Sequence, residues 1–93
     1  MIIRSQNKTM IVNLNNIDCI YYSNRENEII VFNGEAKSSI GKYSTEAKAI
    51  KVLDMIQKAY NSIETMKIDK GAWRDNHYFE MPQDSEVQNE RIY

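Results

Sequence analysis

The residues that most often carry enzyme chemistry are scarce in this chain. It contains one histidine, His77, and one cysteine, Cys19. A Cys–His nucleophile pair needs the two side chains in contact, usually with a third group that orients the histidine. Nothing in the sequence brings His77 to Cys19, which lies in an apolar strand pattern and is expected to be a small core residue. A zinc site needs three or four well-spaced ligands. We therefore expect no enzyme activity, no metal and no cofactor.

Phosphate-binding loops and acid–base pairs are also missing from the pattern. The glycines Gly34, Gly41 and Gly71 are far apart, so they form no glycine-rich phosphate loop. Carboxylates are numerous, but no pair lies in an apolar stretch that would separate the two pKa values, as acid–base catalysis requires. These observations favour a binding protein over an enzyme.

A first candidate binding group is the polar run Arg4-Ser5-Gln6, with Lys8 nearby. The forked guanidinium of Arg4 suits a phosphate, because it can donate two parallel hydrogen bonds. Gln6 would read the polar edges of such a ligand. The alternative is that this run is a solvated edge strand followed by its turn.

A second candidate group is Trp73-Arg74, close to His77-Tyr78. Aromatic rings beside an arginine can stack on a base and hold its phosphates. Trp73 or Tyr78 would stack, and Arg74 would join Arg4 on the phosphates. The alternative is that Trp73 anchors a loop into the core.

The first half of the chain reads as strands that would position Arg4 and Gln6. Apolar residues recur at period two or in short β-branched runs in segments 2–4, 9–14, 17–22 and 28–32. Asn33-Gly34 predicts a hairpin with a type I′ turn, after which residues 35–43 return antiparallel. Gly41 inside that strand indicates a bulge or a close backbone approach.

One helix follows. Ser44 is a suitable N-cap, and the helix is expected to end near Met66. Its apolar stripe is spaced 4-3-4-3 and consists of Ala49, Leu53, Ile56, Tyr60 and Ile63. Such a stripe also suits a coiled coil, but it is short, so packing on a sheet is the favoured use.

Residues 77–81 have the composition of a last strand. Pro82 cannot donate to a ladder, so this strand must stop there or lie at a sheet edge. Its apolar side chains would join either the same chain's sheet or a neighbouring subunit's sheet. The predicted interface residues are Tyr78, Phe79 and Met81. The remaining residues, 82–93, are expected to form a flexible acidic tail.

Length and composition limit the fold and the partners. The chain has 93 residues, of which 42% are hydrophobic and 27% charged, with a net charge of −1. We expect a single α+β domain over residues 1–81, with an antiparallel meander of four or five strands, one amphipathic helix on one face and an edge strand at its end. The charge makes nucleic acid an unlikely partner. One cysteine fits a reducing compartment, and no apolar run reaches the ~18 residues that a membrane span needs. The sequence therefore predicts a cytoplasmic protein.

Three stretches resemble a family of short, mostly uncharacterised proteins of Firmicutes and of their phages and mobile elements. They are IRSQNK at 3–8, IGKYSTEAKAIKVLDMIQ at 40–57 and YFEMPQDSEV at 78–87, together about a third of the chain. The family pattern begins Ile-Arg-Ser-Gln-Asp-Lys, enters its helix through Leu-Gly-x-Tyr-Ser-Thr and ends on Tyr/Phe-x-Met-Pro-x-Asp. This chain departs from it mildly, with Asn7 for aspartate, Ile40 for leucine and Lys42 in the variable position.

The resemblance implies a phage context for the protein. Small oligomeric phage proteins often counter host defence. Some sequester nucleotide-derived signals, such as cyclic ADP-ribose isomers, cyclic dinucleotides or histidine-linked ADP-ribose. We therefore expect a homodimer or higher homo-oligomer in the cytoplasm of the host bacterium that sequesters a small nucleotide-like ligand. The alternative is a protein–protein inhibitor or adaptor, similar to anti-CRISPR proteins, that uses the exposed sheet edge and the acidic tail.

Overall fold

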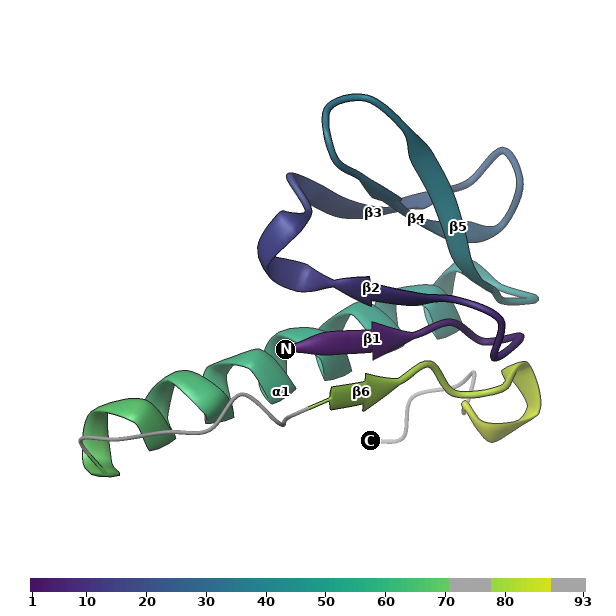
Figure 1. The fold of residues 1–93 in the computed structure, drawn as a ribbon. Coiled ribbons are helices and arrows are strands. Elements are labelled where there is room, and N and C mark those ends of the chain that lie inside the picture. Colours follow the sequence, from purple (N-terminus) through teal and green to yellow (C-terminus); the bar gives the residue numbers. More distant parts are fainter. Residues whose placement is uncertain (71–77, 88–93) are drawn as a thin grey trace.

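The computed structural model describes residues 1–70 and 78–87, with the side chains of 1–62 and 78–87 (Figure 1). The chain has strands and a helix, as the sequence predicts, and the expected α+β class is confirmed. In chain order the elements are β1 (Ile2–Arg4), β2 (Ile11–Asn13), η1 (Leu14–Asn16), β3 (Cys19–Ser23), β4 (Glu28–Phe32), β5 (Lys37–Lys42), α1 (Glu46–Lys70), β6 (Tyr78–Glu80) and η2 (Asp84–Glu86).

The strands divide into two three-stranded sheets rather than one meander (Figure 1). One sheet has the order β3-β4-β5 and is antiparallel throughout. The other has the order β2-β1-β6, with β1 antiparallel to β2 and parallel to β6. The division follows from η1, where the Asn13 side chain accepts a hydrogen bond from the Asn15 N–H. This short turn takes the chain out of the β2-β1-β6 sheet before β3 begins the other sheet. The last strand lies at a sheet edge, as expected.

The hairpin predicted at Asn33-Gly34 is present, but its turn differs from the predicted type I′. Phe32 pairs with Lys37, so residues 33–36 form the loop. Gly34 has a φ of +93°, whereas the Asn33 side chain accepts hydrogen bonds from the N–H groups of Glu35 and Ala36. Asn33 thus closes the loop with its side chain, which a short polar residue does well.

The helix begins one residue later than predicted. Thr45 is its N-cap, because the Thr45 Oγ1 accepts a hydrogen bond of 3.2 Å from the Lys48 N–H, and Ser44 has other partners described below. The backbone stays helical beyond Met66, to Lys70. The buried line runs through Ala49, Val52 and Ile56. Tyr60, which the predicted stripe included, is 38% exposed.

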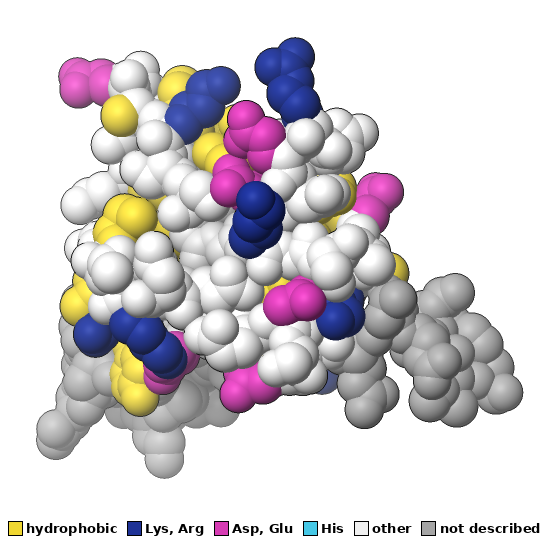
Figure 2. Space-filling model, turned by 90° about the vertical axis from the view of Figure 1, so that its right-hand side faces the viewer, with side chains coloured by type: hydrophobic (Ala, Val, Ile, Leu, Met, Phe, Trp, Pro, Cys, Tyr) yellow, Lys and Arg dark blue, Asp and Glu magenta, His cyan; other side chains and the backbone are white. Residues whose placement is uncertain are grey.

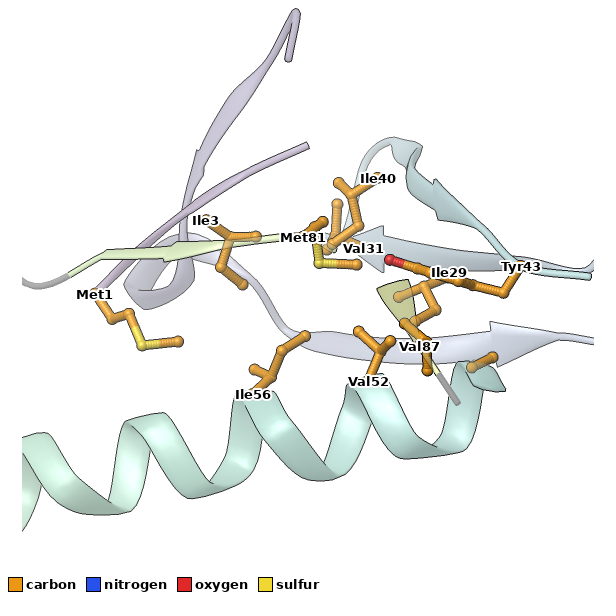
Figure 3. Packing of buried hydrophobic residues seen from close by; sticks show 11 residues of the cluster. Met1, Ile3, Ile29, Val31, Ile40, Tyr43, Val52, Ile56, Met81 and Val87 are labelled. Carbon is orange, nitrogen blue, oxygen red and sulfur yellow. The ribbon is translucent and has the colours of Figure 1, made fainter. Parts of the chain in front are cut away.

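The core lies between the two sheets and the helix. Figure 3 shows buried side chains from β1, β4, β5 and α1 pointing toward one another, with Met81 and Val87 among them. The cluster consists of Met1, Ile3, Ile29, Val31, Ile40, Tyr43, Ala49, Val52, Ile56, Met81 and Val87. Because Met81 is 1% exposed, its side chain belongs to this chain's own core and is not at the surface where an interface would need it.

The folded domain continues beyond residue 81, where the sequence analysis placed its end. Residues 84–86 form η2, and Val87 is buried in the core. Burial of an apolar side chain stabilises a fold by about 1.5–3 kcal/mol, which explains why this acidic stretch packs on the domain. Residues 88–93, the rest of the expected tail, lie outside the described residues. Within the described ranges, no helix has the length and apolarity to cross a membrane.

Candidate functional site

The outer face of the β2-β1-β6 sheet brings together two of the residues predicted to bind a ligand, Arg4 and Tyr78. Alternation along β1 turns Ile3 into the core and leaves Ile2 and Arg4 on the opposite face. The register pairs Ile2 with Tyr78, and Arg4 with both Glu80 and Ile11. A hollow of about 310 Å³ is lined by Ile2, Arg4, Ile11, Tyr78 and Glu80. We call these five residues the β1–β6 surface.

Apolar side chains are unusually exposed on this surface. Tyr78 is 64% exposed, Ile11 is 55% exposed and Ile2 is 38% exposed. Single exposed apolar residues are ordinary, whereas contiguous exposed apolar patches are a feature of binding surfaces.

Arg4 is the cation that this surface can offer to a ligand. Its Nε donates a hydrogen bond of 3.1 Å to the Lys8 carbonyl, which the turn presents because Lys8 has a φ of +71°. Lys8 forms an ion pair with Glu80, so each of these charges has a partner. Within the described part of the chain, the two terminal nitrogens of Arg4 have no hydrogen-bond partner. The guanidinium is therefore held in place through its Nε, and the geometry of its terminal nitrogens suits a two-pronged contact with an anion.

Gln6, in contrast, uses its side-chain amide for hydrogen bonds within the fold. Its Oε1 accepts a hydrogen bond of 2.9 Å from the Lys42 N–H, and its Nε2 donates to the carbonyls of Lys42 and Pro82. The side-chain amide thus pairs with the Lys42 backbone as a strand residue would. The Gln6 N–H also donates to the Ile40 carbonyl at 2.8 Å. Gln6 follows β1 and bonds to Ile40 and Lys42 of β5, so it links the two sheets.

Gln6 is the centre of a junction between three distant parts of the chain. The Tyr43 hydroxyl donates a hydrogen bond of 2.7 Å to the Pro82 carbonyl. The Asp84 carboxylate accepts hydrogen bonds from the N–H and hydroxyl of Ser44. We call this group the Gln6 junction; it consists of Gln6, Gly41, Lys42, Tyr43, Ser44, Lys48, Met81, Pro82, Gln83 and Asp84. It joins segments 3–8, 40–57 and 78–87 of the chain.

Two titratable groups of the Gln6 junction, Tyr43 and Asp84, have pKa values shifted by their surroundings. Burial raises the pKa of the Tyr43 phenol far above its ordinary value, and the nearby Asp84 charge raises it further. The hydrogen bond from the Ser44 backbone lowers the pKa of the Asp84 carboxyl, and Lys48 at 3.5 Å acts in the same direction. Tyr43 stays neutral and Asp84 stays charged at neutral pH. These hydrogen bonds join the start of α1 to the segment that follows β6.

Of the other predicted site residues that the structure describes, Gln6, Phe79 and Met81 do not line the β1–β6 surface. Trp73 and Arg74 lie outside the described residues, as does His77. Phe79 is half-buried and packs against the core. Ile2, Ile11 and Glu80 were not among the predicted residues. The period-two alternation of residues 2–4 and 78–80 is the signal that could have placed Ile2 and Glu80 on the same face as Arg4 and Tyr78.

A second hollow, of about 340 Å³, lies between α1 and β3. It is mainly apolar and is lined by Leu14, Ile20, Leu53, Ile56, Gln57 and Tyr60. Cys19 lines an adjoining hollow and is exposed, so the expectation that it is a core residue is wrong. It lies at the edge of the β3-β4-β5 sheet, in a strand whose other face points to the helix.

Charged side chains do not gather by sign where Figure 2 shows the molecule: lysines, arginines, aspartates and glutamates are interspersed there. Among the described residues, no three histidine, cysteine, aspartate or glutamate side chains are placed to hold a metal ion together. Comparison with known proteins found no matching family model, no matching curated protein and no matching solved structure.

Proposed function

We propose that this chain is a non-enzymatic binding protein that holds a small nucleotide-derived ligand on the β1–β6 surface. One observation carries the proposal: Arg4, whose guanidinium is fixed through its Nε, lines the same hollow as the exposed Tyr78. A guanidinium whose two terminal nitrogens have no partner among the described residues can hold a phosphate, and an accessible aromatic ring can stack on a base.

The remaining residues of the surface fit such a ligand. Ile11 lies opposite Arg4 on β2 and Ile2 lies two residues before it on β1. The hollow of about 310 Å³ is within the range of small-molecule sites. The Glu80 carboxylate forms its ion pair with Lys8 rather than with Arg4. Trp73 and Arg74 remain proposed contributors to the same ligand.

The family resemblance gives this binding a biological purpose. In a phage or mobile element, a small homo-oligomeric protein that removes a nucleotide signal would disarm a host defence system. It would act in the cytoplasm of the host bacterium, where such signals are made. Sequestration requires tight binding and no chemistry.

The test is titration calorimetry of the full chain with cyclic ADP-ribose and with a cyclic dinucleotide. We expect Arg4→Ala to weaken binding at least tenfold, or about 1.4 kcal/mol. Arg25→Ala is the matched control, because Arg25 is an exposed arginine in the β3–β4 loop; it should leave binding unchanged. Equal affinities for wild type and Arg4→Ala would exclude Arg4 from the site.

A protein partner is the second candidate, and the apolar hollow between α1 and β3 favours it. Ile20, Leu53 and Tyr60 could receive an apolar side chain of a host protein. In that case Leu53→Asp would abolish co-purification of the partner from host cells, and Arg4→Ala would leave it unchanged. The acidic tail is a weaker basis for this function, because Asp84 and the Glu86 carboxylate form hydrogen bonds within the chain's own fold.

A further inference from the structure

The outer edge of β6 presents backbone groups that no other strand among the described residues pairs with. β6 is the last strand in the order β2-β1-β6. The Met81 N–H donates a hydrogen bond of 3.0 Å to the Arg4 carbonyl, so Met81 points its backbone groups toward β1. Backbone groups alternate along a strand. The N–H and C=O of Tyr78 and of Glu80 therefore point away from β1, toward the free edge.

We infer that a second copy of this chain pairs antiparallel with β6 about a twofold axis at Phe79. In that register Tyr78 lies opposite the partner's Glu80, and Glu80 lies opposite the partner's Tyr78. Both are hydrogen-bonded pairs, because these are the residues whose N–H and C=O groups point outward, and each pair exchanges two backbone hydrogen bonds. The strand is complementary to itself in both backbone and side chains, since a phenol hydroxyl meets a carboxylate in each pair.

Charge and apolar surface support a second copy over other occupants of this edge. The register keeps the two Glu80 carboxylates from lying directly opposite each other, which would be destabilising, and Lys8 neutralises Glu80 within its own chain. A twofold axis perpendicular to the sheet also keeps the two outer faces on the same side. The exposed Ile2, Ile11 and Tyr78 of both chains then lie on one shared face, with Arg4 and Glu80 between them.

The pairing changes the proposed ligand site, and this step rests on the proposed function. Reading across the joined sheet at the level of Arg4 gives Glu80, then the partner's Tyr78, then the partner's Ile2. Neighbouring strands are about 4.8 Å apart, so the partner's Tyr78 backbone lies about 10 Å from that of Arg4. Each arginine thus faces aromatic rings from both chains, and the site takes a ligand long enough to reach across the interface, such as a nucleotide with its phosphates.

Register-specific disulfide formation tests the interface directly. In a Cys19→Ser background, chains carrying Tyr78→Cys and chains carrying Glu80→Cys are purified separately and mixed under oxidising conditions. Opposed residues in a hydrogen-bonded pair have Cα atoms about 5.5 Å apart, within reach of a disulfide. We expect the mixture to form at least about tenfold more cross-linked dimer than either variant alone. A mixture of Ile11→Cys and Glu80→Cys chains is the control, because β2 lies on the far side of the sheet. Equal cross-linking in all mixtures would overturn the register.

Light scattering after size-exclusion chromatography provides an independent measurement. Wild type should have twice the mass of one chain. Tyr78→Pro removes an outward N–H and should raise the dimer dissociation constant at least about tenfold more than Tyr78→Ala, which keeps that N–H. A wild-type monomer at the highest soluble concentration would overturn the proposal. A dimer that binds no nucleotide would leave the interface standing and refute the proposed function; a monomer that binds nucleotide would do the reverse.

Discussion

Gln6 is a residue whose side-chain type suggested ligand recognition and whose contacts are structural. Its amide bridges the Lys42 backbone and the Pro82 carbonyl. Its removal takes these side-chain hydrogen bonds from the N–H and carbonyl of Lys42, and leaves the Pro82 carbonyl with Tyr43. We expect Gln6→Ala to lower the free energy of unfolding by about 1–3 kcal/mol, measured by urea denaturation. Asn24→Ala, in an exposed loop, should have little effect. Unchanged stability together with weaker nucleotide binding would return Gln6 to the ligand site.

Position 41 requires a glycine because two side chains come close to its backbone. A Cβ at this position would lie 2.9 Å from the Tyr43 Cε2 and 3.0 Å from the Met81 Cε. The register also shifts beside it, between Ile29 and Ile30, which agrees with the predicted bulge, whereas the groups that approach Gly41 are side chains and not backbone. Tyr43 is fully buried and its ring cannot move aside. We expect Gly41→Ala to cost about 1–3 kcal/mol of stability through overpacking. Thermal unfolding of Ser39→Ala, an exposed position of the same strand, provides the comparison and should match wild type.

At the scale of elements, η2 and the start of α1 are joined by one carboxylate. Asp84 accepts hydrogen bonds from Ser44, and its pKa is lowered by them. A carboxyl whose pKa is lower in the folded state stabilises the fold above its unfolded pKa of about 3.9. That stabilisation is lost as the pH falls through the folded-state pKa.

Asp84→Asn should therefore be less stable than wild type near neutral pH, and the difference should shrink as the pH is lowered below about 4. Urea denaturation at several pH values measures it. Asp54→Asn is the matched control, because Asp54 is an exposed carboxylate on α1. A difference between Asp84→Asn and wild type that does not change with pH would show that the charge has no part in joining the two elements.

The elements that the sequence predicted well are those fixed by neighbouring residues. The β4–β5 hairpin follows from an apolar strand and Asn33-Gly34, and the helix follows from its apolar spacing. The split into two sheets was not predictable, because the strand patterns on either side of η1 look alike. The parallel pairing of β1 with β6 joins the two ends of the chain, and no local pattern encodes it.

The whole molecule explains why only part of the candidate site could be predicted. Arg4 and Tyr78 were chosen for their chemistry, and the β1–β6 pairing brings them together. Gln6 could not be assigned in advance, because its partners come from β5 and from Pro82. The same is true of Met81 and Val87, whose burial depends on the meeting of both sheets with α1.

The fold depends on contacts between distant segments, so the position at which the domain ends can be measured from the stability of shortened chains. Gln83 donates a hydrogen bond to the Gln6 carbonyl, Asp84 holds Ser44, and Val87 is 6% exposed. A chain that ends at Pro82 loses all three, whereas a chain that ends at Val87 keeps them. From one buried valine at about 1.5 kcal/mol and hydrogen bonds of about 1 kcal/mol each, we expect the shorter chain to be at least about 2 kcal/mol less stable. Urea denaturation of the two chains decides the point: equal stabilities would place the end of the domain before η2, and a clear difference would make η2 part of the structure that holds Arg4 and Tyr78 in position.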